Sequence, residues 1–319
     1  MEGRTVRSTA SPSAAGHTHL PAALADLHRA LTVGDVLELT VEIGGEHRCA
    51  GTGLGSCSPW SRPVDALSDL LVGGGFAVDH VAGPGRAVDG ALVARARRAR
   101  TLPDTVGPGM RLLVCGLNPS SYAADAGVPF ARPGNRFWPA AQAAGLVATD
   151  RSPGSALADH GVGLTDLVKR ATAGAAELSA DEYRTGLGRL ERLVRWLRPG
   201  ALCVVGLAGW RAAVDRRAVP GPQPTGLGGV AVHLMPSTSG RNARTSLAEL
   251  AGHLRAAAGL ADAAPPQAAM PSASSDSPPP LPRPCRRSRQ DMSSSTSPPK
   301  PTASRMPRPA ASKVWPWKA

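Results

Sequence analysis

An asparagine directly after an apolar run is the first residue in this chain for which chemistry is expected. The run Arg111-Leu112-Leu113-Val114-Cys115 has the composition of a buried strand, and Gly116-Leu117-Asn118-Pro119 follows it. In open α/β sheets, ligands bind at the carboxyl ends of the strands. The amide oxygen of Asn118 can orient a water molecule there, although it cannot take a proton from it. The alternative is a turn residue, because an Asn before Pro often bonds its own backbone.

Aromatic residues gather just after this asparagine. The chain has only three Phe and two Tyr, yet Phe130, Phe137 and Tyr122 all fall between Gly116 and Trp138. Phe130 stands in a Pro-Phe-Ala-Arg-Pro loop, where a core position is unusual, and it is therefore a candidate binding surface. Phe137 and Trp138 begin the helix that follows Asn135, and we expect them to be packing residues.

A second polar loop follows another apolar run. Residues 230–235 (Val-Ala-Val-His-Leu-Met) read as a strand, and Met235-Pro236-Ser237-Thr238-Ser239-Gly240-Arg241-Asn242-Ala243 begins at its end. The carboxyl ends of parallel strands lie along one edge of a sheet, so the two loops can face each other across a cleft.

The elements that must position these loops alternate between strand and helix from Gly109 to about Leu260. Continuous apolar runs predict strands at 111–116 and 201–206, with a short one near 162–164. The clearest helix spans about 181–198 and ends before Pro199-Gly200. This pattern is typical of an α/β domain in three α/β/α layers, with a short, mainly parallel central sheet over residues 101–260.

Taken together, the two loops resemble the signature motifs of the mismatch-specific uracil/thymine DNA glycosylases. This family is the G·U mismatch branch of the uracil-DNA glycosylase superfamily. The first motif matches without a gap from Gly116 to Trp138. The resemblance implies a monofunctional enzyme that binds double-stranded DNA with G·U or G·T mismatches, flips out the base and directs water at the deoxyribose C1′. Uracil is the implied base, with thymine and ethenocytosine as further candidates; no cofactor and no metal are implied.

The resemblance also implies roles for residues of the first motif. Asn118 would orient the water, and Phe130 would stack on the flipped base. Backbone N–H groups near Leu117 and Phe130 would hold the uracil carbonyls. Ala123 stands where some members carry Ser and leaves room for a 5-methyl group, whereas Ser120 replaces the usual Gly and narrows the expected pocket. An Asp occupies the place of Asn118 in the fast uracil-specific branch, so slower chemistry is expected here.

In the second motif, the resemblance makes Arg241 the residue that wedges into the duplex. Gly240 permits close approach, and the neighbouring backbone with Asn242 would contact the orphaned guanine. Ser237 and Ser239 are expected to contact the flanking phosphates. Other branches place a His where Met235 stands, which favours the mismatch-specific branch. No Lys occupies either motif, and Lys169 is the nearest, so a Schiff-base lyase activity is not expected.

Residues 20–100 read as a smaller α/β unit. A helix is predicted at 21–31, a strand at 35–41, a helix from Pro63 to the glycines at 73–75, and a short strand at 76–78. This order resembles the carboxyl half of a class I methyltransferase, without the early Gly-rich loop that would hold the methyl donor. Gly51-x-Gly53-x-Gly55 follows no strand and reads better as a loop. We interpret the unit as an accessory remnant without activity of its own.

Three further features concern charge and cysteine. The basic run at 94–100 is interpreted as a helix end or linker, with contact to a phosphate backbone as the alternative. Five Cys without a C-x-x-C pair argue against a disulfide framework or a four-thiolate metal site, and Cys115 and Cys203 should be core residues.

The two ends of the chain are expected to be disordered. Residues 261–319 hold nine Lys or Arg against three Asp, a net charge of +6 that is half of the chain's +12, and are rich in Pro and Ser. Such a composition cannot bury enough apolar surface to fold. Residues 1–19 are assigned to disorder as well. No secretory or membrane segment is recognisable, and we expect a cytoplasmic, nucleoid-associated monomer.

Two other functions stay open at this point. A non-catalytic nucleic-acid-binding module could keep the same fold, with Ser120 as the change that abolished turnover. An active methyltransferase is the third interpretation, and the missing Gly-rich loop argues against it.

Overall fold

The computed structural model describes residues 4–10, 19–43, 63–83 and 90–264. The predictions for the glycine-rich segment 51–55, for Cys49, Cys57 and Cys285, and for the basic tail beyond 264 lie outside these residues. Among the helices described, none combines the length and the apolar character that a membrane crossing requires.

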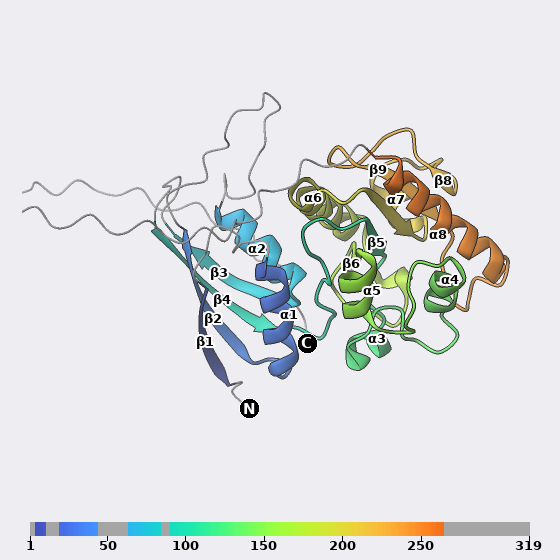
Figure 1. Ribbon diagram of the computed structural model, residues 1–319. Helices are drawn as coiled ribbons and strands as arrows, with labels where there is room; N and C mark the ends of the chain where they lie inside the picture. The colour runs from blue at the N-terminus through green and yellow to red at the C-terminus, as the bar shows by residue number, and fades with distance from the viewer. Residues whose placement is uncertain (1–3, 11–18, 44–62, 84–89, 265–319) are drawn as a thin grey trace, which may run out of the picture. The chain divides into compact units, whose positions relative to one another are not determined.

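The amino-terminal unit is a four-stranded sheet with two helices. Its elements are β1 (Thr5–Ala10), α1 (Leu20–Ala30), β2 (Val36–Ile43), α2 (Pro63–Gly73), β3 (Phe76–Ala82) and β4 (Gly90–Arg98). The strand order is β1-β2-β4-β3; β1 and β2 are parallel, and β4 is antiparallel to both of its neighbours. The two helices lie on one face of this sheet, over a core made mainly of Leu and Ala side chains (Figure 1). The resemblance to a methyltransferase half stays a prediction.

Two predictions for this unit are wrong. Residues 5–10, assigned to disorder, form β1, because each of them pairs in parallel register with β2. The basic run, interpreted as a linker or helix end, lies mostly in β4. There Ala94 and Ala96 are buried while Arg95 and Arg97 point outward and form ion pairs with Glu38 and Asp79.

The second sheet has five strands in the order β6-β5-β7-β9-β8, and its first four strands are mutually parallel. The strands are β5 (Leu112–Gly116), β6 (Val162–Asp166), β7 (Ala201–Val205), β8 (Gly221–Pro222) and β9 (Ala231–Met235). The helices are α3 (Ser121–Ala126), α4 (Phe137–Ala143), α5 (Pro153–His160), α6 (Ala180–Leu197), α7 (Ala208–Ala213) and α8 (Leu247–Asp262). The predicted strands and the long helix are thus present within one or two residues of their expected ends.

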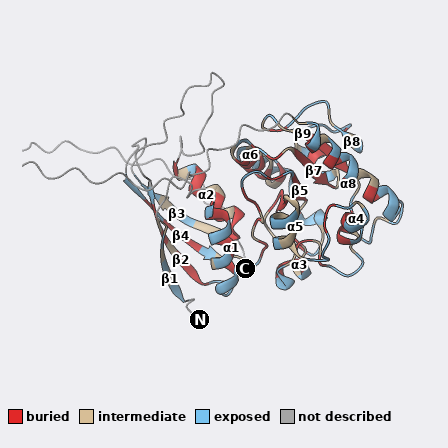
Figure 2. Ribbon diagram, in the orientation of Figure 1, coloured by how far each residue is buried: buried red, intermediate tan, exposed pale blue. Residues whose placement is uncertain are grey.

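Alternate residues of the central strands supply two separate cores. Leu112 and Val114 of β5 face a cluster that includes α4 and α8, while Leu113 and Cys115 face a cluster that includes α6 and α7. Strands β5, β6 and β7 are buried along their whole length (Figure 2). Burial on both faces explains why these strands are continuous apolar runs in the sequence. The predicted three-layer α/β/α fold is confirmed.

Helix α6 offers a test of this packing, because two of its glycines meet different surroundings. A methyl group added at Gly186 would lie 2.0 Å from the backbone oxygen of Leu167, whereas at Gly188 the nearest atom would be Nη1 of Arg192, 3.4 Å away. We expect Gly186→Ala to lower the free energy of unfolding by about 1–3 kcal/mol, because the backbone has to move. Gly188→Ala should raise it by up to about 1 kcal/mol, because Ala is the better helix former.

Urea unfolding followed by circular dichroism measures both changes. If the two variants shifted stability in the same direction by similar amounts, the close contact of α6 with Leu167 would be contradicted.

Candidate active site

The carboxyl ends of all four parallel strands, with the loops after β5, β6 and β9, line one open cleft of about 700 Å³. Its lining includes every residue given a catalytic, base-binding or DNA-binding role in the two motifs except Gly240. The lining residues are Leu102, Leu117, Asn118, Pro119, Ser120, Ala123, Phe130, Arg132, Asn135, Asp166, Thr172, Ala173, Gly174, Ala175, Val205, Ser237, Thr238, Ser239, Arg241, Asn242, Ala243 and Arg244. The structure therefore brings the two predicted motifs together, and adds a third segment after β6 that the sequence analysis did not name.

The side chain of Asn118 is held by its amide nitrogen. Nδ2 donates to the carbonyl oxygens of Pro119 (3.1 Å) and Arg170 (3.0 Å) and to Oγ1 of Thr172 (2.8 Å). Because all three partners accept hydrogen bonds, the end of the amide that faces them must be the nitrogen. Within the described part of the chain no group donates to Oδ1, so this oxygen is free to accept hydrogen bonds from a molecule in the cleft.

Phe130 presents one face of its ring to the cleft because the other face is covered. Its ring stacks on Phe137, with the centroids 4.1 Å apart and the planes 26° from parallel. Its backbone is in the left-handed region, with φ at 58°, a conformation that costs a non-glycine residue free energy and is often found at functional sites. The indole Nε1 of Trp138 donates to the carbonyl of Pro129 (2.8 Å) and braces this loop. Phe137 and Trp138 are each 1% exposed, which confirms that they are packing residues.

Asp166 is the cleft residue that the sequence analysis missed. It is the last residue of β6 and is 7% exposed, and no side-chain or backbone donor among the described residues bonds its carboxylate oxygens. Burial is the main reason that the pKa of Asp166 is raised to about 6; Asp104 adds to the rise, while Lys169 and Arg189 oppose it. The carboxylate lies against Gly116, where an added methyl group would come within 2.5 Å of Oδ1.

A buried cluster of charged side chains stabilises the carboxyl end of β6. The carboxylate of Asp104 accepts from Lys169 Nζ (2.8 Å), Arg189 Nη1 (2.8 Å) and Thr165 Oγ1 (2.6 Å). Arg189 Nη2 donates to the backbone oxygen of Asp166 (2.9 Å). Lys169 is thus paired inside the protein, 8% exposed, and does not line the cleft.

The second motif is tied to the first by backbone contacts. Arg136 donates from its backbone to Thr238 O (2.9 Å) and from its guanidinium to the carbonyl oxygens of Asn242 and Thr245. Gly240 touches the first motif, because a methyl group there would lie 2.8 Å from the oxygen of Gly134. The loop that ends in the predicted wedge is therefore a braced structure.

The polar side chains of this loop are partly used within it. Asn242 Nδ2 donates to Ser237 O (2.8 Å), Ser237 Oγ accepts from the backbone of Ser239 (3.3 Å), and Ser239 Oγ accepts from the backbone of Arg241 (3.3 Å). Arg241 is exposed, and its Nη1 lies 3.7 Å from where a methyl group on Gly174 would be. Its side chain therefore reaches across the cleft toward the segment after β6.

The remaining pocket residues have structural partners as well. Ser120 is the N-cap of α3, and its Oγ accepts from the backbone of Ala123 (3.1 Å). Ala123 is buried, and Leu117 packs toward Gly209. His233 is buried beneath α8, with Nε2 at 3.0 Å from Nδ1 of His253, and burial lowers the pKa of His233 to about 4.

Across residues 4–10, 19–43, 63–83 and 90–264, no group of three or more His, Cys, Asp and Glu side chains is arranged to hold a metal. Cys115 and Cys203 are buried, as predicted, and burial raises the pKa of both thiols.

Comparison with known protein families places much of this domain in a superfamily. Residues 103–257 match the sequence model of the Uracil DNA glycosylase superfamily, a span that includes the five-stranded sheet and almost all of the cleft. Members of this superfamily are DNA glycosylases, which are hydrolases. The superfamily predicted from the two motifs is thus supported, and its mismatch-specific branch stays a prediction.

The raised pKa of Asp166 gives a test that needs no substrate. The carboxyl titrates near pH 6 in the folded protein and near 3.8 in the unfolded chain. Between these values the folded protein keeps a proton that the unfolded chain has released, so the free energy of unfolding falls as pH rises through the window. Asp166→Asn removes the buried charge. The gain in free energy of unfolding of the variant over the parent should therefore be larger at pH 8 than at pH 4, by up to about 3 kcal/mol.

Urea unfolding of parent and variant at the two pH values measures this difference. Asp150→Asn, which changes an exposed carboxylate, serves as the control. An effect of Asp166→Asn that did not depend on pH would show that the carboxyl has no raised pKa.

Proposed function

We propose that residues 103–257, a uracil-DNA glycosylase superfamily domain, excise uracil from mismatches with guanine in double-stranded DNA and so begin base excision repair. The product would be an abasic site. Thymine and ethenocytosine opposite guanine are candidate bases at lower rates. The working form proposed is a monomer without a cofactor.

The observation that carries this proposal is the fixed amide of Asn118 in a cleft that also holds an aromatic face. With Nδ2 bound to three acceptors, only Oδ1 is left to orient a water molecule. The open face of Phe130 is suited to stacking on a flipped base, which contributes about 1–3 kcal/mol without reading the base's edge. Water and base would thus be held by the two segments that flank α3.

Asp166 supplies the group that Asn118 lacks. In hydrolysis the water oxygen bonds to C1′, the bond from C1′ to the base nitrogen breaks, and its electron pair leaves with the base. The attacking water loses a proton, which an amide cannot accept. Above a pH of about 6 the buried carboxylate of Asp166 is ionised and can accept it. We therefore assign Asn118 to orienting the water and Asp166 to taking its proton.

The cleft walls leave room for uracil and for bases that carry a 5-methyl group. Ala123 is small, which leaves space beside the base, while the hydroxyl of Ser120 is bound to the backbone of α3. Because that hydroxyl is directed to the helix, Ser120 narrows the pocket less than a free side chain would. A 5-methyl group is therefore compatible with this wall.

The rim of the cleft carries the groups proposed to bind the duplex. Arg241 is exposed and is proposed as the wedge that replaces the flipped base. Arg132 and Arg244 also line the cleft and are proposed to contact phosphates, with Ser237 and Ser239. Lys169 is paired with Asp104 away from the cleft, so we propose base release without strand cleavage.

The first activity prediction concerns Asn118. A duplex with one G·U mismatch, incubated with the protein and then treated with alkali, should be cut at the uracil. Asn118→Ala should slow base release by at least about 100-fold, because the water is no longer oriented. Gln142→Ala removes an amide outside the cleft and should leave the rate unchanged. Salt-sensitive binding of the mismatch by the parent without any cleavage would favour the non-catalytic module instead.

The second activity prediction concerns pH. If Asp166 takes the proton, the single-turnover rate should fall about tenfold per pH unit below pH 6 and level off above it. In Asp166→Asn the rate should be low and nearly flat between pH 5 and pH 8. The same inflection in the variant as in the parent would rule out this role.

A further inference from the structure

Arg170 connects Asn118 to the start of helix α6. Its backbone oxygen accepts from Nδ2 of Asn118 (3.0 Å), while its guanidinium donates to both carboxylate oxygens of Glu182, from Nε (2.7 Å) and from Nη2 (3.1 Å). Nη2 also donates to the carbonyl of Glu177 (2.8 Å). One residue therefore touches the proposed water-orienting group with its main chain and a helix end with its side chain.

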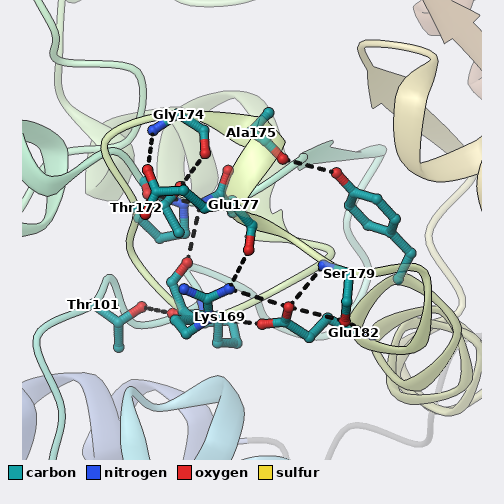
Figure 3. Close-up of polar contacts among 12 residues, drawn as sticks. Thr101, Lys169, Thr172, Gly174, Ala175, Glu177, Ser179 and Glu182 are labelled. Carbon is teal, nitrogen blue, oxygen red and sulfur yellow. Dashed lines mark hydrogen bonds and ion pairs between the residues drawn. The ribbon is translucent and has the colours of Figure 1, made fainter. Parts of the chain in front are cut away.

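Glu182 is a fixed anchor for this guanidinium. It is the third residue of α6, and its carboxylate accepts from the backbone of Ser179 (2.9 Å), whose Oγ in turn accepts from the backbone of Glu182 (3.2 Å). This capping box orders the first turn of the helix. Figure 3 shows Ser179 and Glu182 facing each other, with Lys169 and Thr172 on the adjoining loop. The Arg170 guanidinium holds the pKa of Glu182 below its usual range.

The loop between these anchors also fixes the second acceptor of Asn118. Thr172 Oγ1 donates its proton to Gly174 O (3.0 Å), so its lone pairs face Nδ2 of Asn118 at 2.8 Å. Gly174 is held in turn by Glu177, whose Oε1 accepts from the glycine's backbone at 2.8 Å. Two of the three acceptors of the Asn118 amide thus belong to a segment of three residues, 170–172, that Arg170 ties down.

The Arg170 side chain lies outside the cleft in which a duplex would bind. It does not line the cleft, and its side chain is 31% exposed against 19% for Glu182. A bidentate Arg–carboxylate pair of this kind is geometrically specific, and Lys cannot reproduce it. Its effect on a reaction in the cleft would therefore pass through the loop and not through contact with DNA.

We propose that Arg170 is a positioning residue. Through its pair with Glu182 it holds residues 170–172 so that the Asn118 amide keeps its nitrogen on the protein and its oxygen toward the cleft. The consequence for catalysis rests on the proposed glycosylase function, whereas the consequence for the Asn118 side chain does not.

The kinetic test compares Arg170→Gln, Glu182→Gln and the double variant with Arg184→Gln, which breaks an exposed ion pair with Asp181 in the same helix. We expect each single variant to slow single-turnover uracil release about tenfold, because one hydrogen-bonded restraint is lost. The double variant should fall no further, because the two residues act as one unit. Arg184→Gln should match the parent, and Arg170→Lys should restore only part of the rate.

Binding to a mismatch that resists cleavage, 2′-fluoro-2′-deoxyuridine opposite guanine, separates positioning from DNA contact. The dissociation constant should stay within about twofold of the parent for Arg170→Gln. Arg132→Ala is the contrast, and it should weaken binding and reduce the salt slope by about 1. A reduced salt slope in Arg170→Gln would make it a phosphate contact and overturn the proposal, as would an unchanged rate of uracil release.

A readout without activity keeps this proposal distinct from the proposed function. The side-chain NH₂ signals of Asn118, identified by their loss in Asn118→Ala, should exchange with solvent about tenfold faster in Arg170→Gln and Glu182→Gln. Faster exchange in a protein that releases no uracil would support the positioning role and reject the glycosylase function. Unchanged exchange in a folded variant would reject the positioning role, whatever the activity.

Discussion

The cleft depends on the absence of a side chain at Gly116, the last residue of β5. A methyl group there would lie 2.5 Å from Asp166 Oδ1 and 3.3 Å from Cζ of Phe130. Because Gly116 has no side chain, a buried carboxylate and an aromatic ring can both approach this strand end. Any other residue would push one of them away, and Asn118, two residues later, would lose its surroundings.

The sheet converts this local constraint into a site. With β6, β5, β7 and β9 parallel, the loops after all four strands open on one edge. The loops after β5 and β6 are joined by main-chain bonds from Leu167 to Gly116, from Val168 to Leu117 and from Thr172 to Pro119. These bonds continue the pairing of the two strands beyond their ends. The loops that carry the polar groups of the cleft are therefore joined to each other by main-chain bonds as well as by side-chain contacts.

The sequence predicts the scaffold well, because strands buried on both faces leave an unmistakable apolar signature. The two motif loops could be placed together for the same reason, since both follow such strands. Asp166 was missed because the predicted strand near 162–164 is short, and nothing in a single Asp after it reveals burial or the absence of a partner. Arg170 could not be predicted either, since its effect on Asn118 passes through its own carbonyl.

The basic run in β4 shows an error of a different kind. Its alternation of Ala and Arg has the period of two that marks a half-buried strand, and the alanines are indeed the buried set. The number of positive charges obscured that period. For β1 the signal was weaker, because its residues alternate only between exposed and half-buried positions at the edge of the sheet.

The acceptors around Asn118 limit how this site can change over evolutionary time. Two of them are backbone carbonyls, 3.0 and 3.1 Å from the side-chain nitrogen, and a carbonyl has no proton to give. An aspartate at 118 would direct a negatively charged oxygen at both carbonyls. The repulsion would favour the protonated form of the carboxyl or displace the side chain from this position. Exchange of Asn for Asp is a single-nucleotide change, yet an ionised carboxylate here would also need the carbonyls of residues 119 and 170 to turn away. A protein with this loop conformation therefore retains an amide side chain at position 118.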